Sequence, residues 1–220
     1  MFQWLASIAP GRDLAWDCAT GNGQAAVELA EVFARVIATD ASEKQVGNAE
    51  RHAGVEYRVA SAEASGLESS SVDVITVAQA LHWFDLEQFF AEARRVLKPE
   101  GVLAAWAYKL ATVTPSIDAL VNHYYSDVVG PYWPAERVLV EKFEELPFRR
   151  PEIEAPAFEM VAEWSVEQLL GYLSTWSATQ RFIAAEKRDP LEGVEKELRK
   201  VWGAETRRVT WPLTMKVGRT

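Results

Sequence analysis

The sequence of 220 residues has one cysteine, three histidines and no long apolar run. The single cysteine, Cys18, excludes an internal disulfide framework and a cysteine-rich zinc site. The histidines, His52, His82 and His123, are scattered and have no carboxylate at ligand spacing, so we expect no bound metal. No window reaches the roughly 18 unbroken apolar residues that a membrane span needs, so we expect no membrane partner.

Positive charge is also scarce. The chain has 23 lysines and arginines against 32 aspartates and glutamates, a formal net charge of -9, which makes nucleic acid a poor candidate partner. The N-terminus, Met1 to Leu5, has no basic segment, and the apolar stretch before Pro10 is too short for a signal peptide. With 49% hydrophobic and 25% charged residues, the composition predicts a folded protein with a single domain over residues 1–220. The lack of a targeting signal or membrane span in the sequence predicts a cytoplasmic location.

Short runs of β-forming residues alternate with helical stretches through the first half of the chain. These runs lie at 14–17, 36–40, 55–59, 72–77 and 102–106. The fourth run has no polar face, which is typical of a strand buried on both sides. Helices are expected between the runs, including one from Ser42 to about Arg51 and one capped by Asp85. The alternation predicts an α/β fold, a doubly wound, Rossmann-like, mostly parallel sheet with helices on both faces.

The second half of the chain is less regular. Residues 111–156 hold five of the ten prolines and predict a helical insertion after the fifth strand, which we expect to cover the substrate. Two further strands are expected at 158–164 and 207–217. Between them, the pattern predicts one helix that begins at Ser165 and another over 190–202.

The end of the first predicted strand carries the strongest chemical signal. Ligands of such sheets bind beyond the carboxyl ends of the strands, and residues 17–24 follow the first run with Gly21 and Gly23. Glycine lets a ligand approach the backbone closely, and the helix that follows supplies free amides. With Ala26, the same glycines also satisfy a loose dinucleotide-binding pattern. A tight turn that binds no ligand is the alternative interpretation.

Acidic residues at the strand ends narrow the choice of ligand. Asp17 would repel a pyrophosphate but attract an ammonium or sulfonium group. Asp40, 19 residues after Gly21, stands where a residue that chelates ribose hydroxyls belongs, although it could also cap a helix. Glu63, after Ala62, could accept from the exocyclic amine of adenine or lie in a solvated loop. This set favours a cationic adenosine ligand over a dinucleotide.

These motifs resemble those of a known family. Asp17-x-Ala19-x-Gly21-x-Gly23, with Asp40, Ala62-Glu63 and Leu97-Lys98-Pro99-Glu100-Gly101, is similar to the class I methyltransferases that use S-adenosylmethionine. The segments 79–85, 164–165 and 170–177 are similar to its type 11 branch, which includes trans-aconitate methyltransferase-like proteins. The resemblance covers nearly the whole chain. It implies a seven-stranded sheet with an antiparallel last strand, S-adenosylmethionine as cofactor, and a small-molecule methyl acceptor, with a small carboxylic acid as the candidate class.

The resemblance also implies which residues contact the cofactor. They are Asp17, Ala19, Thr20, Gly21, Asn22, Gly23, Asp40, Ala41, Ala62, Glu63, Gln79 and Ala80. The sequence departs from the family at Ala19, where a glycine is usual, and at Glu100, where little effect is expected. It also lacks the N-terminal segment rich in Tyr, Arg and Pro that folds over the cofactor in the family, so either that lid is absent or the form is shortened.

Each residue predicted to contact the methyl acceptor could also have a purely structural role. His82 is the candidate catalytic base, unless it only orders its loop. Aromatic side chains could line the acceptor pocket or simply pack the core: Trp83, Trp106, Tyr108, Trp133, Tyr172 and Trp176. Tyr172, Trp176 and Gln180 are expected on one face of the helix that begins at Ser165. Arg149, Arg150 and Arg181 could clamp a carboxylate, although isolated surface arginines are commoner.

Two other functions remain open at this point. The Gly21-x-Gly23-x-x-Ala26 pattern would also suit a nicotinamide-dependent oxidoreductase, although Asp17 argues against a pyrophosphate. The departure at Ala19 and the missing segment would also suit a catalytically silent module that binds S-adenosylmethionine.

Overall fold

The computed structural model describes residues 1–135, 137–148 and 152–219, which form two compact units. Unit 1 comprises Met1–Ala107, Lys142–Pro156 and Thr214–Thr220, and unit 2 comprises Tyr108–Glu141 and Ala157–Leu213. The predicted insertion, residues 111–156, is thus divided between the two units. Its role as a substrate cover and the single domain over residues 1–220 stay predictions.

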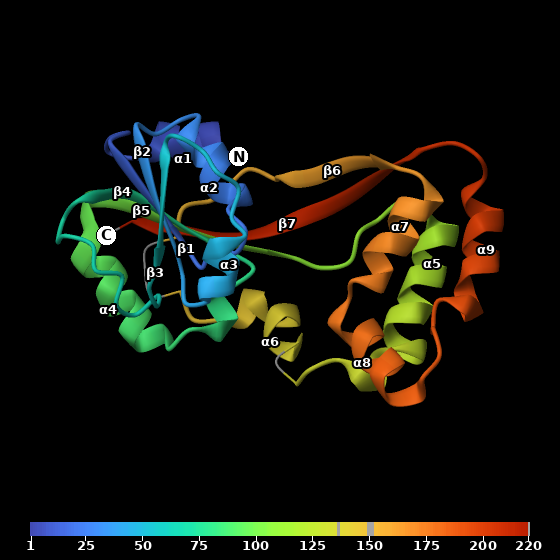
Figure 1. Ribbon diagram of the computed structural model, residues 1–220. Helices are drawn as coiled ribbons and strands as arrows, with labels where there is room; N and C mark the ends of the chain where they lie inside the picture. Colours follow the sequence, from blue (N-terminus) through green and yellow to red (C-terminus); the bar gives the residue numbers. More distant parts are fainter. Residues whose placement is uncertain (136, 149–151, 220) are drawn as a thin grey trace. The chain divides into compact units, whose positions relative to one another are not determined.

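A seven-stranded sheet carries the fold, in the order β3-β2-β1-β4-β5-β7-β6 (Figure 1). Its strands are β1 (Leu14–Cys18), β2 (Arg35–Asp40), β3 (Val55–Val59), β4 (Val72–Ala78), β5 (Leu97–Tyr108), β6 (Glu159–Trp164) and β7 (Arg207–Arg219). The first five pair in parallel, whereas β6 and β7 pair antiparallel. The predicted fold class is therefore confirmed. The strand order reverses between β1 and β4, which is where ligands of such sheets bind.

The sheet of unit 1 buries a different apolar cluster on each face. Neighbouring residues alternate between the faces: Ala15 belongs to the cluster under α1 (Phe2–Ile8) and α2 (Gln24–Ala30), and Trp16 to the cluster under α4 (Leu86–Val96). Figure 1 shows α4 on the opposite side of the strands from α1 and α2. This alternation is the period of two that a strand imposes on its side chains, so the central strands β1 and β4 pack against both clusters.

Helix α3 (Glu43–Gly47) begins as predicted but is shorter. The side chain of Ser42 caps it by accepting a hydrogen bond from the amide of Gln45. The helix ends well before Arg51 because Asn48 follows it and donates from its side chain to the carbonyl of Lys44. Asparagine competes in this way with the backbone hydrogen bonds that would prolong a helix.

Unit 2 is mainly helical. Its helices are α5 (Pro115–His123), a π-helical turn (Tyr124–Val128), a 3-10 turn (Gly130–Tyr132), α6 (Arg137–Glu141), α7 (Val166–Ser174), α8 (Ser177–Glu186) and α9 (Glu192–Trp202). Two other 3-10 turns, Leu81–Trp83 and Phe143–Glu145, belong to unit 1. Among the described residues, no helix is both long and apolar enough to cross a bilayer.

The helix predicted from Ser165 through Gln180 is wrong in one respect, because the chain breaks it into α7 and α8. Trp176 is extended, with φ -61° and ψ 136°, and precedes α8. Just before it, the hydroxyls of Ser174 and Thr175 donate back to the carbonyls of Gly171 and Tyr172. Such side-chain bonds compete with helix propagation. Tyr172 and Trp176 still meet, whereas Gln180 lies on the next helix.

Candidate active site

A pocket of about 400 Å³ opens in unit 1 at the carboxyl ends of its parallel strands. Residues that follow β1, β2, β3 and β4 contribute to it. Its lining consists of Ala19, Gly21, Asp40, Ala41, Gln45, Ala60, Ser61, Ala62, Glu63, Ala78, Gln79, Ala80, Trp83 and Phe84. This lining contains two carboxylates and neither lysine nor arginine. The pocket therefore suits a ligand that is neutral or positively charged.

The glycine loop after β1 has the conformation that its sequence suggested. Gly21 and Gly23 have φ angles of 59° and 90°, in the left-handed region that glycine adopts readily. A Cβ at residue 23 would also collide with the hydroxyl end of the Tyr57 side chain, which would have to move. The backbone angle therefore favours glycine at residue 23, and the close approach of Tyr57 adds to this preference.

Two residues other than glycine share this left-handed conformation at the pocket. Ala19 has a φ angle of 56° and Gln79 one of 54°, and both line the pocket. The amide of Gln79 donates to the carbonyl of Trp106 at 2.9 Å, which ties the end of β4 to β5. Left-handed backbone costs a non-glycine residue about 1–2 kcal/mol, and strained residues of this kind cluster at functional sites.

Asp40 joins the two loops that flank the pocket. One carboxylate oxygen accepts from the amide of Gly21 at 2.9 Å, and the other accepts from the amide of Ser42 at 2.8 Å. Each carboxylate oxygen has a second lone pair, so Asp40 can hold the loops and still accept hydrogen bonds from a ligand. Glu63 also lines the pocket, and its side chain accepts from the amide of Asp85 at 3.1 Å.

Asp17 lies beneath the glycine loop rather than in the pocket lining. Its carboxylate is buried and accepts hydrogen bonds from the hydroxyls of Thr20 and Thr76, at 2.5 and 2.7 Å. Burial raises the pKa of Asp17 to about 6, against the opposing effect of these hydrogen bonds. The pKa of the neighbouring Cys18 thiol is also raised, chiefly by burial. Asp17 therefore acts on the pocket through the loop that it supports.

The structure thus separates the predicted cofactor residues into two groups. Eight line the pocket: Ala19, Gly21, Asp40, Ala41, Ala62, Glu63, Gln79 and Ala80. Four lie in or below the loop: Asp17, Thr20, Asn22 and Gly23. The sequence argument missed Gln45, Ala60, Ser61, Ala78 and Phe84. Most of these immediately follow or end a strand, so a closer inspection of strand ends could have found them; Gln45 has no such signal.

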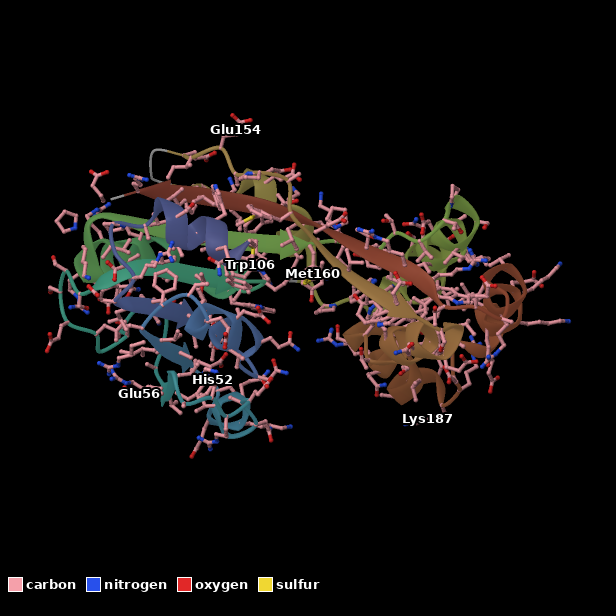
Figure 2. All side chains as sticks on the ribbon, turned by 90° about the horizontal axis from the view of Figure 1, so that it is seen from above. His52, Glu56, Trp106, Glu154, Met160 and Lys187 are labelled. Atoms are coloured by element: carbon pink, nitrogen blue, oxygen red, sulfur yellow. The ribbon has the colours of Figure 1, made fainter. Side chains whose placement is uncertain are left out.

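The acceptor residues predicted in unit 1 differ in exposure. Trp83 is 60% exposed and lines the pocket. The His82 ring lies 4.9 Å from the Trp83 ring, and His82 is not part of the lining. Trp106, labelled in Figure 2, is only 4% exposed and packs edge-on against Phe2 at 6.1 Å.

The acceptor residues predicted in the second half cluster within unit 2. Trp176 lies 5.5 Å from the ring of Trp133 and 5.7 Å from that of Tyr172, and Tyr108 packs against the same apolar cluster. Arg149 and Arg150 lie outside the described residues, and Arg181 is exposed on α8. The structure therefore brings Trp133, Tyr172 and Trp176 together.

Comparison with known proteins agrees with this geometry. Residues 16–105 match the family described as "Methyltransferase domain". A Dictyostelium discoideum protein described as a methyltransferase is 39% identical over 197 residues, which cover 87% of this chain and 74% of that protein. A Mycolicibacterium smegmatis protein described as an S-adenosylmethionine-dependent methyltransferase is 32% identical over 128 residues, which cover 57% of this chain and 49% of that protein.

A solved structure is similar over nearly the whole chain. It is described as a type II methyltransferase from Anaeromyxobacter dehalogenans, and it superposes with a TM-score of 0.95 at 46% identity. The match covers 99% of this chain and 94% of that chain. With the strand order and the acidic pocket, these similarities establish that the chain belongs to the class I methyltransferases that use S-adenosylmethionine as cofactor.

Proposed function

We propose that the protein transfers the methyl group of S-adenosylmethionine to a small-molecule acceptor, with a small carboxylic acid as the acceptor class. The proposal that S-adenosylmethionine is the cofactor rests on the pocket of unit 1, which has two carboxylates and no lysine or arginine in its lining. A sulfonium cofactor suits that charge. The pyrophosphate of a nicotinamide dinucleotide would meet Asp40 and Glu63 without a cation, which disfavours the oxidoreductase alternative.

Four of the lining residues have a specific role in this proposal. The second lone pairs of the Asp40 carboxylate accept from the two ribose hydroxyls, and Glu63 accepts from the adenine amine. Trp83 and Phe84 supply aromatic surface, which attracts a sulfonium through its quadrupole. When bound, S-adenosylmethionine supplies the methyl group and a neutral thioether as leaving group. The protein's part is then to align the acceptor and to exclude water.

The acceptor determines whether a base is needed. A carboxylate is already ionised at neutral pH, so no side chain has to remove a proton from it, whereas a phenol or a carbon acid would need one. His82, beside Trp83, is the candidate base for the second kind of acceptor. With a carboxylate acceptor we expect His82→Ala to retain turnover, because only the orientation of its loop would change.

Calorimetric titration and product analysis test this function. S-adenosylhomocysteine should bind with a 1:1 stoichiometry, whereas NAD and NADP should not bind. Incubation with S-adenosylmethionine and a panel of small carboxylic acids, phenols and amines should yield methyl esters by mass spectrometry. Binding of a dinucleotide in place of S-adenosylhomocysteine would contradict the cofactor half. Methylation of phenols or amines alone would contradict the carboxylic acid half.

A further inference from the structure

Unit 2 contains a pocket of its own, of about 470 Å³. Small-molecule sites have volumes of about 300–1,000 Å³ and combine apolar walls with a few converging polar groups. This pocket has apolar walls such as Leu110 and four charged side chains, those of Lys109, Asp118, Arg137 and Glu141. The formal charges cancel, so the pocket does not attract polyanions by its overall charge.

Arg137, at the start of α6, is held in a fixed orientation at this pocket. The central carbon of its guanidinium lies 4.9 Å from the ring centre of Trp133 and 5.5 Å from that of Tyr125. Its Nε donates to the hydroxyl of Tyr125 at 3.0 Å. In the described part of the chain, no residue accepts a hydrogen bond from its Nη1 or Nη2. The guanidinium is therefore oriented by protein groups while its two terminal nitrogens keep their donors.

Tyr125 owes its position to an unusual element. It lies in the π-helical turn Tyr124–Val128, and such turns occur frequently at functional sites. Tyr124 is buried and hydrogen-bonded to Thr179, whereas Tyr125 lines the pocket. The Tyr125 hydroxyl donates to the carboxylate of Glu141, four residues after Arg137 on the same helix. The carboxylate of Glu141 is thereby engaged by Tyr125 and forms no ion pair with Arg137 in the described part of the chain.

We propose that this pocket binds the methyl acceptor, and that the acceptor is a small monocarboxylate with an apolar body, gripped by Nη1 and Nη2 of Arg137. The inference rests on the proposed function and names its substrate site. A guanidinium fork matches the two oxygens of a carboxylate, and Leu110 offers apolar surface to the rest of the molecule. Apart from Arg137, the charged side chains of the pocket are Lys109, Asp118 and Glu141, whose formal charges sum to -1, so the additional carboxylates of a tricarboxylate should bind poorly.

Calorimetry with three defined probes tests the inference. The probes are benzoate, its neutral analogue benzamide, and the tricarboxylate tricarballylate, each titrated into protein saturated with S-adenosylhomocysteine. The variants are Arg137→Gln, Arg137→Lys and the matched control Arg188→Gln. Arg188 is also an arginine of unit 2 stacked on an aromatic ring, at 4.8 Å from Phe182, but it does not line the pocket.

The wild type should bind benzoate at least tenfold more tightly than benzamide or tricarballylate. Arg137→Gln should remove this preference, Arg137→Lys should lose most of it because the fork is lost, and Arg188→Gln should keep it. Equal affinity for benzoate and benzamide would overturn the inference, as would unchanged benzoate affinity in Arg137→Gln. Tighter binding of tricarballylate than of benzoate would overturn the monocarboxylate class.

The same titrations distinguish this inference from the proposed function. Binding of S-adenosylhomocysteine reports the pocket of unit 1 and, with the thermal midpoint, shows that each variant is folded. If S-adenosylhomocysteine binds and no carboxylate does, the assignment of the unit 2 pocket to the acceptor is wrong, and the assignment of the unit 1 pocket to the cofactor is unaffected. If S-adenosylhomocysteine does not bind the wild type, the proposed function fails whatever benzoate does.

Discussion

Units 1 and 2 differ in the kinds of side chain that form their cores, and their pockets differ as well. The sheet of unit 1 buries mostly small and branched aliphatic side chains, and its pocket is shaped by loop backbone at the strand ends. Unit 2 is held by neighbouring aromatic rings, from Tyr125 through Trp133 and Trp176 to Tyr172 and beyond. Its pocket is lined by residues 109–112 after β5 and by side chains on α5, the π-helical turn and α6. A site defined by backbone suits a constant cofactor, whereas a site defined by side chains can be adapted to one acceptor.

The largest effect on this comparison is expected from removal of the indole ring of Trp176, which lies among the aromatic rings of unit 2. Trp176 is 9% exposed and contacts the rings of Tyr124, Tyr125, Trp133 and Tyr172. Trp176→Ala should lower the free energy of unfolding by about 3–5 kcal/mol, because the cavity lies among side chains that cannot close it.

Urea unfolding measures this loss. Trp83→Ala is the control in unit 1, since Trp83 is 60% exposed and its removal should cost far less stability. The affinity of folded Trp176→Ala for S-adenosylhomocysteine should be that of the wild type. A loss of more than tenfold in that affinity would contradict the assignment of the cofactor to unit 1.

A second prediction concerns the buried acid of unit 1. The pKa of Asp17 is raised from 3.8 to about 6, chiefly by burial. The folded state therefore binds this proton more tightly than the unfolded state. The resulting stabilisation is complete below about pH 4 and is lost as the pH rises through about 6. A shift of about two units corresponds to about 3 kcal/mol.

The pH dependence can be isolated by substitution. Between pH 4 and pH 7, the stability of Asp17→Asn relative to the wild type should rise by about 3 kcal/mol, because asparagine does not ionise. Urea unfolding at several pH values measures the difference in unfolding free energy between the variant and the wild type. The other titrating groups contribute equally to both proteins, so their contributions cancel in this difference. A difference that stays constant with pH would mean that the Asp17 pKa is not raised.

Substitution of Asp40 tests whether its carboxylate, which lines the pocket of unit 1, contributes to cofactor binding. Asp40→Ala removes two hydrogen bonds to loop amides and the expected ribose contact, which should weaken S-adenosylhomocysteine binding by about 1.5–3 kcal/mol, or about 10- to 150-fold. Glu43→Ala is the control, because Glu43 is exposed on α3 and does not line the pocket. Unchanged affinity by calorimetry would remove Asp40 from the site.

The smallest predicted effect concerns the strained loop. Ala19→Gly relieves a left-handed backbone at φ 56°, and glycine loses more entropy on folding, so the net gain in stability should be at most about 1 kcal/mol. Ala19→Val should destabilise the protein, since a β-branched side chain tolerates this conformation poorly. Thermal unfolding compares the two. A lower thermal midpoint for Ala19→Gly than for the wild type would contradict the inferred backbone strain at residue 19.

Sequence reasoning predicted unit 1 better than unit 2, for physical reasons. Strands such as β4 are rich in valine and isoleucine on both faces, and Gly21, Gly23 and Asp40 have conformational or hydrogen-bonding requirements that local sequence expresses. The position of Asp17 below the loop depends on Thr76, 59 residues away, and no local pattern encodes it.

Unit 2 depends on contacts that short sequence patterns do not express. The break between α7 and α8 follows from hydroxyls that bond to the preceding turn, which helical periodicity ignores. Arg137 was not predicted as an acceptor residue, because its orientation depends on Tyr125 and Trp133 and on a π-helical turn. Clustered prolines and aromatics indicated irregular structure there, but not which side chains would meet.

Hydrogen exchange measured by mass spectrometry tests the division between a cofactor unit and an acceptor unit most directly. We predict that S-adenosylhomocysteine protects amides of residues 17–23, 40–45, 60–63 and 78–84 in unit 1. Benzoate, added to this complex, should further protect the segments around Tyr125 and Arg137 in unit 2. Protection by S-adenosylhomocysteine confined to unit 2, or benzoate protection confined to unit 1, would contradict the account.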